Sequence, residues 1–104
     1  MNGTIAVSQG DDEVTIHVKG RFSFDVHAPF RAAYQSVMQS DVRPRRWTLD
    51  LGGTDYIDSS ALGMMLLLKE AVGGHEADIS IIRVPKEIRQ ILETANFQKL
   101  FTLS

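Results

Sequence analysis

Hydrophobic and polar residues alternate near the start of the chain with the period of two that is typical of strands. Ile5 and Val7 indicate a short first strand. Between Glu13 and Lys19 the alternation is strict, which predicts a second, half-buried strand that ends at Gly20. The glycine and aspartates of residues 9–12 suit a turn. We therefore expect these two strands to form a hairpin.

After Pro29 the apolar residues recur at spacings of three and four, which predicts an amphipathic helix that ends near Ser40. A loop over residues 41–46 follows this helix. Residues 47–51 then alternate again and indicate a further strand. We expect Gly52-Gly53-Thr54 to break this strand, since two adjacent glycines are typical of turns.

A second helix is predicted to begin at Asp58-Ser59-Ser60, because these N-capping residues directly precede the strong helix formers of residues 61–72. Gly73-Gly74 fits its C-terminal end. Residues 64–68 are Met-Met-Leu-Leu-Leu, so the helix is apolar almost all round. Either complete burial or an adaptable, methionine-rich contact surface for a partner explains this composition.

The last part of the chain contains a buried strand over residues 79–84 and a third helix that Pro85 opens. The apolar face and C-terminal cap of this helix are predicted at Ile88, Ile91, Leu92, Ala95 and Asn96. The expected anchors of a short tail are Phe97, Leu100 and Phe101. The order β-β-α-β-α-β-α predicts an α/β fold with a mixed, largely parallel sheet.

Composition restricts the classes of function. The chain of 104 residues can bury one hydrophobic core, and the absence of cysteine excludes disulfides and thiolate metal sites. The formal net charge of −2 does not favour general binding to nucleic acid or membrane surfaces, and we interpret the basic segment 43–47 as a loop entering a strand. Residues 61–68, the longest apolar run, are too few to cross a membrane, and no signal pattern is present. We expect a cytoplasmic monomer.

Motifs for catalysis and cofactors are absent from the sequence. Ser59 follows an aspartate, but the chain lacks a Gly-x-Ser-x-Gly elbow, and its three histidines are interpreted as ordinary surface or turn residues. No two histidines share a helix face, which argues against a metal site. Gly52-Gly53 lacks the lysine and serine of a phosphate-binding loop. We therefore expect no enzyme activity, no cofactor and no metal.

The most informative segment is Asp58-Ser59-Ser60-Ala61-Leu62-Gly63, which follows a strand and a turn and opens a helix. Taken alone, it is a capping signal. The first amides of a helix are unpaired and carry a partial positive charge, so the domain tolerates a phosphate on a serine at this position. A serine there can serve as a switch.

This segment, after the strand at residues 47–51, resembles the Asp-Ser-[Ser/Thr]-[Gly/Ala]-Leu-Gly motif of the STAS domain family, notably of bacterial anti-sigma factor antagonists. Gly20-Arg21 resembles the Gly-[Arg/Lys] at the end of the second strand of the family, and Asp25 resembles the acidic residue that follows it. The resemblance extends over essentially the whole chain. It implies one STAS domain over residues 1–104.

In such antagonists the serine after the aspartate accepts a phosphate from a serine kinase that is also the anti-sigma factor. The resemblance implies that this acceptor is Ser59, with Ser60 as the alternative. The unphosphorylated form binds the kinase and frees the sigma factor, the phosphorylated form releases the kinase, and a serine phosphatase resets the cycle. The implied partner-binding residues are Asp25, Asp58, Ser60, Leu62, Gly63 and Met64.

A different role is open within the same family. STAS domains without an acceptor serine occur as structural subunits of transporters or as signalling scaffolds. In such a subunit Ser59 would only cap the helix and would never carry a phosphate. The presence of Ser59 favours the regulated branch of the family.

Overall fold

Five strands form one sheet in the part of the chain that the computed structural model describes, residues 3–41 and 43–104. The strands lie in the order β1-β2-β3-β4-β5. The first pair is antiparallel and the other pairs are parallel, which confirms the mixed, largely parallel sheet. The bounds are Thr4–Gln9 for β1, Glu13–Phe22 for β2, Arg46–Ile57 for β3, Ile79–Ile82 for β4 and Thr102–Leu103 for β5.

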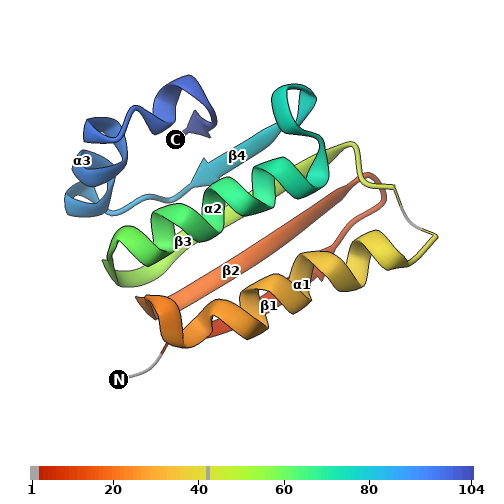
Figure 1. Cartoon of the computed structure of the whole chain (residues 1–104), viewed down its shortest axis with the longest axis horizontal. Helices are drawn as coiled ribbons and strands as arrows, with labels where there is room; N and C mark the ends of the chain where they lie inside the picture. The colour runs from red at the N-terminus through yellow and green to blue at the C-terminus, as the bar shows by residue number, and fades with distance from the viewer. Residues whose placement is uncertain (1–2, 42) are drawn as a thin grey trace.

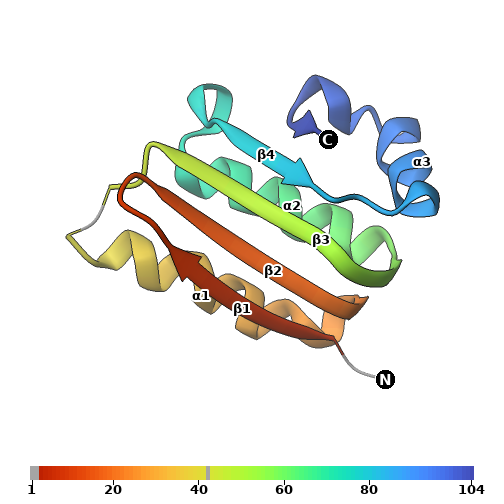
Figure 2. The same cartoon turned by 180° about the vertical axis from the view of Figure 1, so that it is seen from behind.

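Helices α1 and α2 cover one face of the sheet (Figure 1), and the opposite face shows the strands in front of these helices (Figure 2). We call the face seen in Figure 2 the open face. The predicted order β-β-α-β-α-β-α is confirmed, and the short strand β5 follows it. The helices span His27–Gln39 for α1, Ser59–Val72 for α2 and Lys86–Thr94 for α3, with single 3-10 turns at Phe24–Val26 (η1), Gly74–Glu76 (η2) and Phe97–Lys99 (η3).

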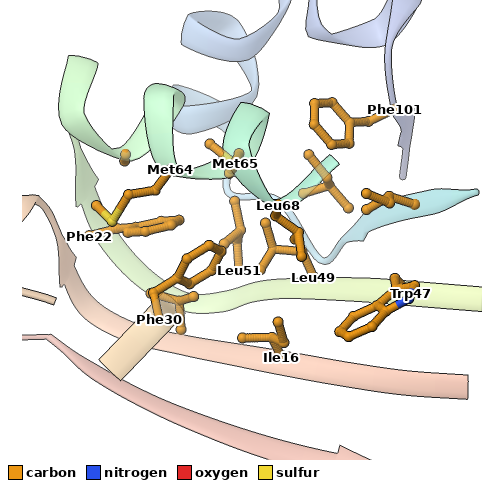
Figure 3. Close-up of a cluster of buried hydrophobic side chains, with 14 of the residues drawn as sticks. Ile16, Phe22, Phe30, Trp47, Leu49, Leu51, Met64, Met65, Leu68 and Phe101 are labelled. Atoms are coloured by element: carbon orange, nitrogen blue, oxygen red, sulfur yellow. The ribbon is translucent and has the colours of Figure 1, made fainter. Parts of the chain in front are cut away.

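Apolar side chains on the covered face form the core between the sheet and the helices (Figure 3). Alternation along the strands explains this, because every second side chain of β2 and of the first part of β3 points toward α1 and α2. Trp47 is only 5% exposed and belongs to the core. Other core members are Ile16, Leu49 and Leu51 from the strands and Phe30, Met65 and Leu68 from the helices.

The two central strands continue through glycines at which we expected them to end. Gly20 lies inside β2 with a φ of 79°, a left-handed conformation that favours glycine, and the strand extends to Phe22. Gly52-Gly53 lies inside β3, where the register against β2 shifts between His17 and Lys19 as in a bulge. The prediction that Gly52-Gly53 forms a turn is wrong, because pairing with β2 carries the strand past these residues.

The C-terminal part differs from the prediction in two ways. β4 ends at Ile82, earlier than expected, because Arg83 adopts a left-handed conformation with a φ of 54°. Phe97 and Phe101 are buried and anchor the tail, but Leu100 is 42% exposed and does not. The tail then pairs with β4 through β5, a strand too short to produce a recognisable pattern in the sequence.

Helices α2 and α3 bury one side and expose apolar residues on the other. Leu66 and Leu67 are 41% and 57% exposed, so the apolar composition of α2 reflects partial burial. Ile91 in α3 and Ala95, directly after its end, are exposed although we placed them on the buried face. The buried residues are Met64, Met65 and Leu68 in α2 and Ile88 and Leu92 in α3.

Candidate functional site

The ends of the two central parallel strands bring Ser23 and Asp58 together. Phe22 of β2 pairs with Ile57 of β3, so the next residue of each chain segment lies at the same edge of the sheet. The Ser23 hydroxyl donates to Asp58 Oδ2 at 2.5 Å. Asp58 Oδ1 accepts from the Ala61 amide at 3.2 Å, which makes Asp58 the N-cap of α2. The predicted start of the second helix at the serines is confirmed.

These contacts set the charge state of Asp58. The hydrogen bond from the Ser23 hydroxyl lowers the pKa of Asp58, and the amides of Ala61 and Ser60 act in the same direction. The positive charge of Arg21 lowers the same pKa further, against an opposing contribution from burial. The carboxyl of Asp58 is therefore ionised at neutral pH and holds a negative charge at the start of α2.

Ser59 is the first residue of α2 and is exposed, whereas Ser60 is half-buried. Among the described residues, no hydrogen bond engages the hydroxyl of Ser59. The oxygens of Asp58 accept instead from the Ser23 hydroxyl and from backbone amides. A hydroxyl that is exposed and makes no hydrogen bond is accessible to a modifying enzyme such as a kinase.

An apolar groove of about 490 Å³ begins at Ser60, the residue that follows Ser59. We call it the α2 groove. Phe24 is 67% exposed on its rim and stacks on His27, with ring centroids 5.3 Å apart. The groove is lined by Phe24, His27, Ser60, Gly63, Met64, Leu66 and Leu67.

The residues predicted to bind a partner lie in different places in the structure. Ser60, Gly63 and Met64 line the α2 groove, although the Met64 side chain is 5% exposed and extends toward Phe22 in the core (Figure 3). Leu62 faces away from them and lines a second groove of about 380 Å³ against α3. Asp25 is exposed in η1. The role of each of these residues in binding stays a prediction.

Two residues of the site were not predicted from the sequence. Ser23 contacts Asp58, and Phe24 lies on the rim of the α2 groove. The signal available for Ser23 was its position directly after a strand that pairs in parallel with the strand before Asp58. For Phe24 the signal was an aromatic residue between two polar ones, Ser23 and Asp25, in a predicted loop.

A second polar cluster lies on the open face, and we call it the Asp50 cluster. Arg83 donates from Nε and Nη2 to the two oxygens of Asp50, at 3.0 and 2.7 Å. The Gly52 amide donates to Oδ1 at 2.9 Å, and His17 Nδ1 lies 2.8 Å from Oδ2. Ser8 Oγ lies 2.7 Å from His17 Nε2. Sequence analysis left His17 without a partner, because its contacts come from other strands.

The Asp50 cluster has a serine, a histidine and an aspartate in the connectivity of a hydrolytic triad. Arg83 compensates the charge of Asp50 and, by its hydrogen bonds, holds the pKa of that carboxyl far below its ordinary value. The aspartate of a triad stabilises a developing imidazolium, a role that Arg83 opposes here. We therefore interpret the cluster as a clamp that joins neighbouring strands across the open face.

None of the His, Asp and Glu side chains of the described residues gather in groups of three or more that could hold a metal ion. None of the helices in this part of the chain has the length and apolar character needed to cross a membrane.

Comparisons with known proteins identify the family of this chain. The family described as "Mlab, STAS domain" matches residues 5–103. A STAS-domain containing protein of Pseudomonas aeruginosa is 45% identical over 101 residues, which cover 97% of each chain.

Solved structures share the fold. An anti-sigma factor antagonist from Mycobacterium paratuberculosis has a TM-score of 0.81 at 18% identity and covers 98% of this chain and 85% of its own. The anti-sigma factor antagonist SpoIIAA in its unphosphorylated form has a TM-score of 0.68 at 13% identity, with 93% of this chain and 97% of that one covered. At these identities the likeness concerns the fold alone. The match over residues 5–103 and the close relative together show that this chain belongs to the STAS domain family.

Proposed function

We propose that this protein is an anti-sigma factor antagonist whose binding to a serine-kinase anti-sigma factor is controlled by phosphorylation of Ser59. The unphosphorylated protein binds the kinase in the cytoplasm and frees the sigma factor. Phosphorylation releases the kinase, and a serine phosphatase restores the binding form. The domain itself catalyses no reaction in this cycle.

The observation that carries this proposal is the exposed, unbonded hydroxyl of Ser59 at the first residue of α2, next to the α2 groove. Phe24 and Leu67 present apolar surface there, as the buried centre of an interface requires. The phosphoacceptor and the apolar contact surface therefore lie together. Anti-sigma factor antagonists among the structural neighbours support the choice of partner.

Charge explains why phosphorylation would release the partner but spare the fold. A phosphate adds about two negative charges and takes the formal net charge from −2 to about −4. Burial of this group against a partner without matching cations costs about 4 kcal/mol, which weakens binding about a thousandfold. The start of α2 stabilises the same phosphate by about 1 kcal/mol. The complex is lost while the domain stays folded.

The test is a binding experiment with Ser59→Ala and Ser59→Asp. We expect Ser59→Ala to retain a serine kinase of the anti-sigma type in a pull-down and Ser59→Asp to lose it. Mass spectrometry of the wild-type protein after incubation with the captured kinase and ATP should place the added phosphate on Ser59. A phosphate on Ser60 would identify the alternative acceptor.

Ser36→Asp is the matched control, since Ser36 is an exposed serine of α1 that lines neither the α2 groove nor the Asp50 cluster. This variant adds the same charge and should retain the kinase. Equal retention of Ser59→Ala and Ser59→Asp would contradict the switch. Copurification with a transporter, together with the absence of a phosphorylated form in cells, would support the structural subunit.

A further inference from the structure

A buried hydroxyl outside the recognised motif contacts the aspartate of that motif. Ser23 is 8% exposed and precedes the short helix η1 with an extended backbone at a φ of −144°. A serine in this position commonly bonds an amide of the helix that follows it. The Ser23 side chain makes no such cap and donates instead to Asp58, which is 35 residues away in the sequence. Its hydrogen bond therefore acts on another element.

The hydrogen bond from Ser23 affects which other hydrogen bonds the carboxylate of Asp58 can accept. Its Oδ1 accepts from the Ala61 amide and its Oδ2 from the Ser23 hydroxyl. Hydrogen bonds between a hydroxyl and a carboxylate are strong, so a carboxylate without enough donors attracts the hydroxyls beside it. The hydroxyl that follows Asp58 directly in the chain belongs to Ser59. Ser23 therefore competes with Ser59 for the oxygens of Asp58.

We propose that Ser23 is a positioning residue for phosphorylation: by occupying Asp58, its hydroxyl leaves the Ser59 hydroxyl free to attack the phosphoryl donor. This inference rests on the proposed function, because it takes Ser59 as the acceptor. In the reaction Ser59 Oγ bonds to the γ-phosphorus of ATP, the bond from that phosphorus to the bridging oxygen breaks and ADP leaves. The proton of Ser59 passes to a base of the kinase. A hydroxyl that donates to Asp58 is turned away from this reaction.

The kinetic test compares Ser23→Ala with Ser23→Thr, which keeps a hydroxyl, using the kinase captured in the pull-down. We expect Ser23→Ala to lower kcat for Ser59 phosphorylation about tenfold, since a hydroxyl–carboxylate bond must break first. KM should change less than about twofold, because the α2 groove stays intact. Ser23→Thr should restore kcat. Ser8→Ala is the matched control, because Ser8 bonds His17 on the open face.

Nuclear magnetic resonance provides a reading that does not depend on the kinase. Loss of the Ser23 hydroxyl should raise the pKa of Asp58, and the amide resonance of Ser59 should then follow the titration of Asp58 more strongly than in the wild type. If Ser23→Ala does not fold, Ser23→Cys takes its place, since a thiol is a much weaker donor. A thermal melt of each variant identifies loss of folding.

The outcomes separate this inference from the proposed function. Wild-type protein phosphorylated on Ser59, with Ser23→Ala phosphorylated at the same kcat, overturns the positioning role and leaves the switch in place. A wild-type protein that never accepts phosphate on Ser59 overturns both. A reduced kcat that Ser23→Thr restores, with an unchanged KM, supports the positioning role.

Discussion

Asp50 and Asp58 lie near each other in the sequence but have different electrostatic surroundings. Asp50 lies within β3, is 3% exposed and forms an ion pair with Arg83 at 2.7 Å. Asp58 follows the end of the same strand, and its hydrogen bonds come from uncharged donors, the Ser23 hydroxyl and backbone amides. Among the described residues no ion pair involves Asp58. The charge of Asp50 is compensated by an ion pair with Arg83, whereas Asp58 has the positive charge of Arg21 in its surroundings without forming an ion pair.

The difference separates stability from recognition. A buried carboxylate that is paired with a cation and bonded to an amide joins strands, and its loss leaves those partners unsatisfied. A carboxylate held by neutral donors at a helix start keeps its negative charge available to a partner. A phosphate on Ser59 would add to that charge. Arg21, whose charge acts on Asp58, also stacks on Tyr56, with its guanidinium carbon 4.4 Å from the ring centroid. The middle of β3 therefore contributes to stability, and the end of β3 holds the residues of the proposed switch.

The largest expected effect on stability comes from Asp50→Ala. Its removal should lower the free energy of unfolding by about 3 kcal/mol, because the Gly52 amide and Arg83 lose their acceptor. Urea denaturation at neutral pH measures this change. Binding of the kinase should be preserved in the folded fraction, because the cluster lies on the open face, away from the α2 groove. A variant as stable as the wild type would contradict the clamp.

The stability of the protein at acid pH provides a second test of the Asp50 cluster. The guanidinium of Arg83 holds the pKa of Asp50 below its unfolded value of about 4, so its contribution to stability is present above that pH and is lost as the pH falls through the folded pKa. The wild type should therefore lose stability as the pH falls below about 4. In Asp50→Asn the free energy of unfolding should depend less on pH in the acid range, because the titrating group is gone.

A smaller effect is expected from Asp58→Ala. Loss of this N-cap should cost about 1 kcal/mol in the free energy of unfolding, since the Ala61 amide and the Ser23 hydroxyl become unpaired at a partly solvated helix end. Thermal and urea unfolding measure the change, with Asp58→Asn as the control that retains a capping oxygen. A loss as large as that of Asp50→Ala would contradict the contrast between the two aspartates.

The smallest effects come from a pair of glycines, and they should have opposite signs. A Cβ at Gly52 would lie 2.8 Å from Arg83 Nε, so Gly52→Ala should displace the guanidinium from Asp50 and cost about 1 kcal/mol. A Cβ at Gly63 meets nothing within 4 Å, and Gly63→Ala should stabilise helix α2 by about 0.5 kcal/mol. Urea denaturation of both variants decides. A Gly52→Ala variant as stable as the wild type would show that the Gly52–Arg83 contact is unimportant.

Much of the fold was predictable because its signals are local. Alternation located β2, spacings of three and four located α1, and the capping residues placed the start of α2 at Ser59. The motif Asp58-Ser59-Ser60 was also recognisable, because its residues are consecutive. A helix start depends on a few adjacent side chains and amides, so a short segment contains all the information it needs.

The errors concern residues whose environment comes from distant segments. Gly52-Gly53 has a turn composition, yet β2 on one side holds it in a strand. Arg83 was predicted inside a strand, but its left-handed backbone directs the side chain over Gly52 to Asp50. Neither outcome follows from local propensity, because pairing energy and an ion pair outweigh it.

By itself, the sequence determined the order of the elements, the buried faces of the central strands and the position of Ser59 at the start of a helix. Only the tertiary structure decided that Ser23 holds Asp58, that Phe24 and Leu67 border one groove, and that Asp50 is neutralised by Arg83, which follows β4. The physical reason is the separation in sequence between the residues that interact. Periodicity and capping act between residues a few positions apart, whereas the contacts of Asp50 with His17 and Arg83 each span 33 residues and exist only once the parallel strands are in register.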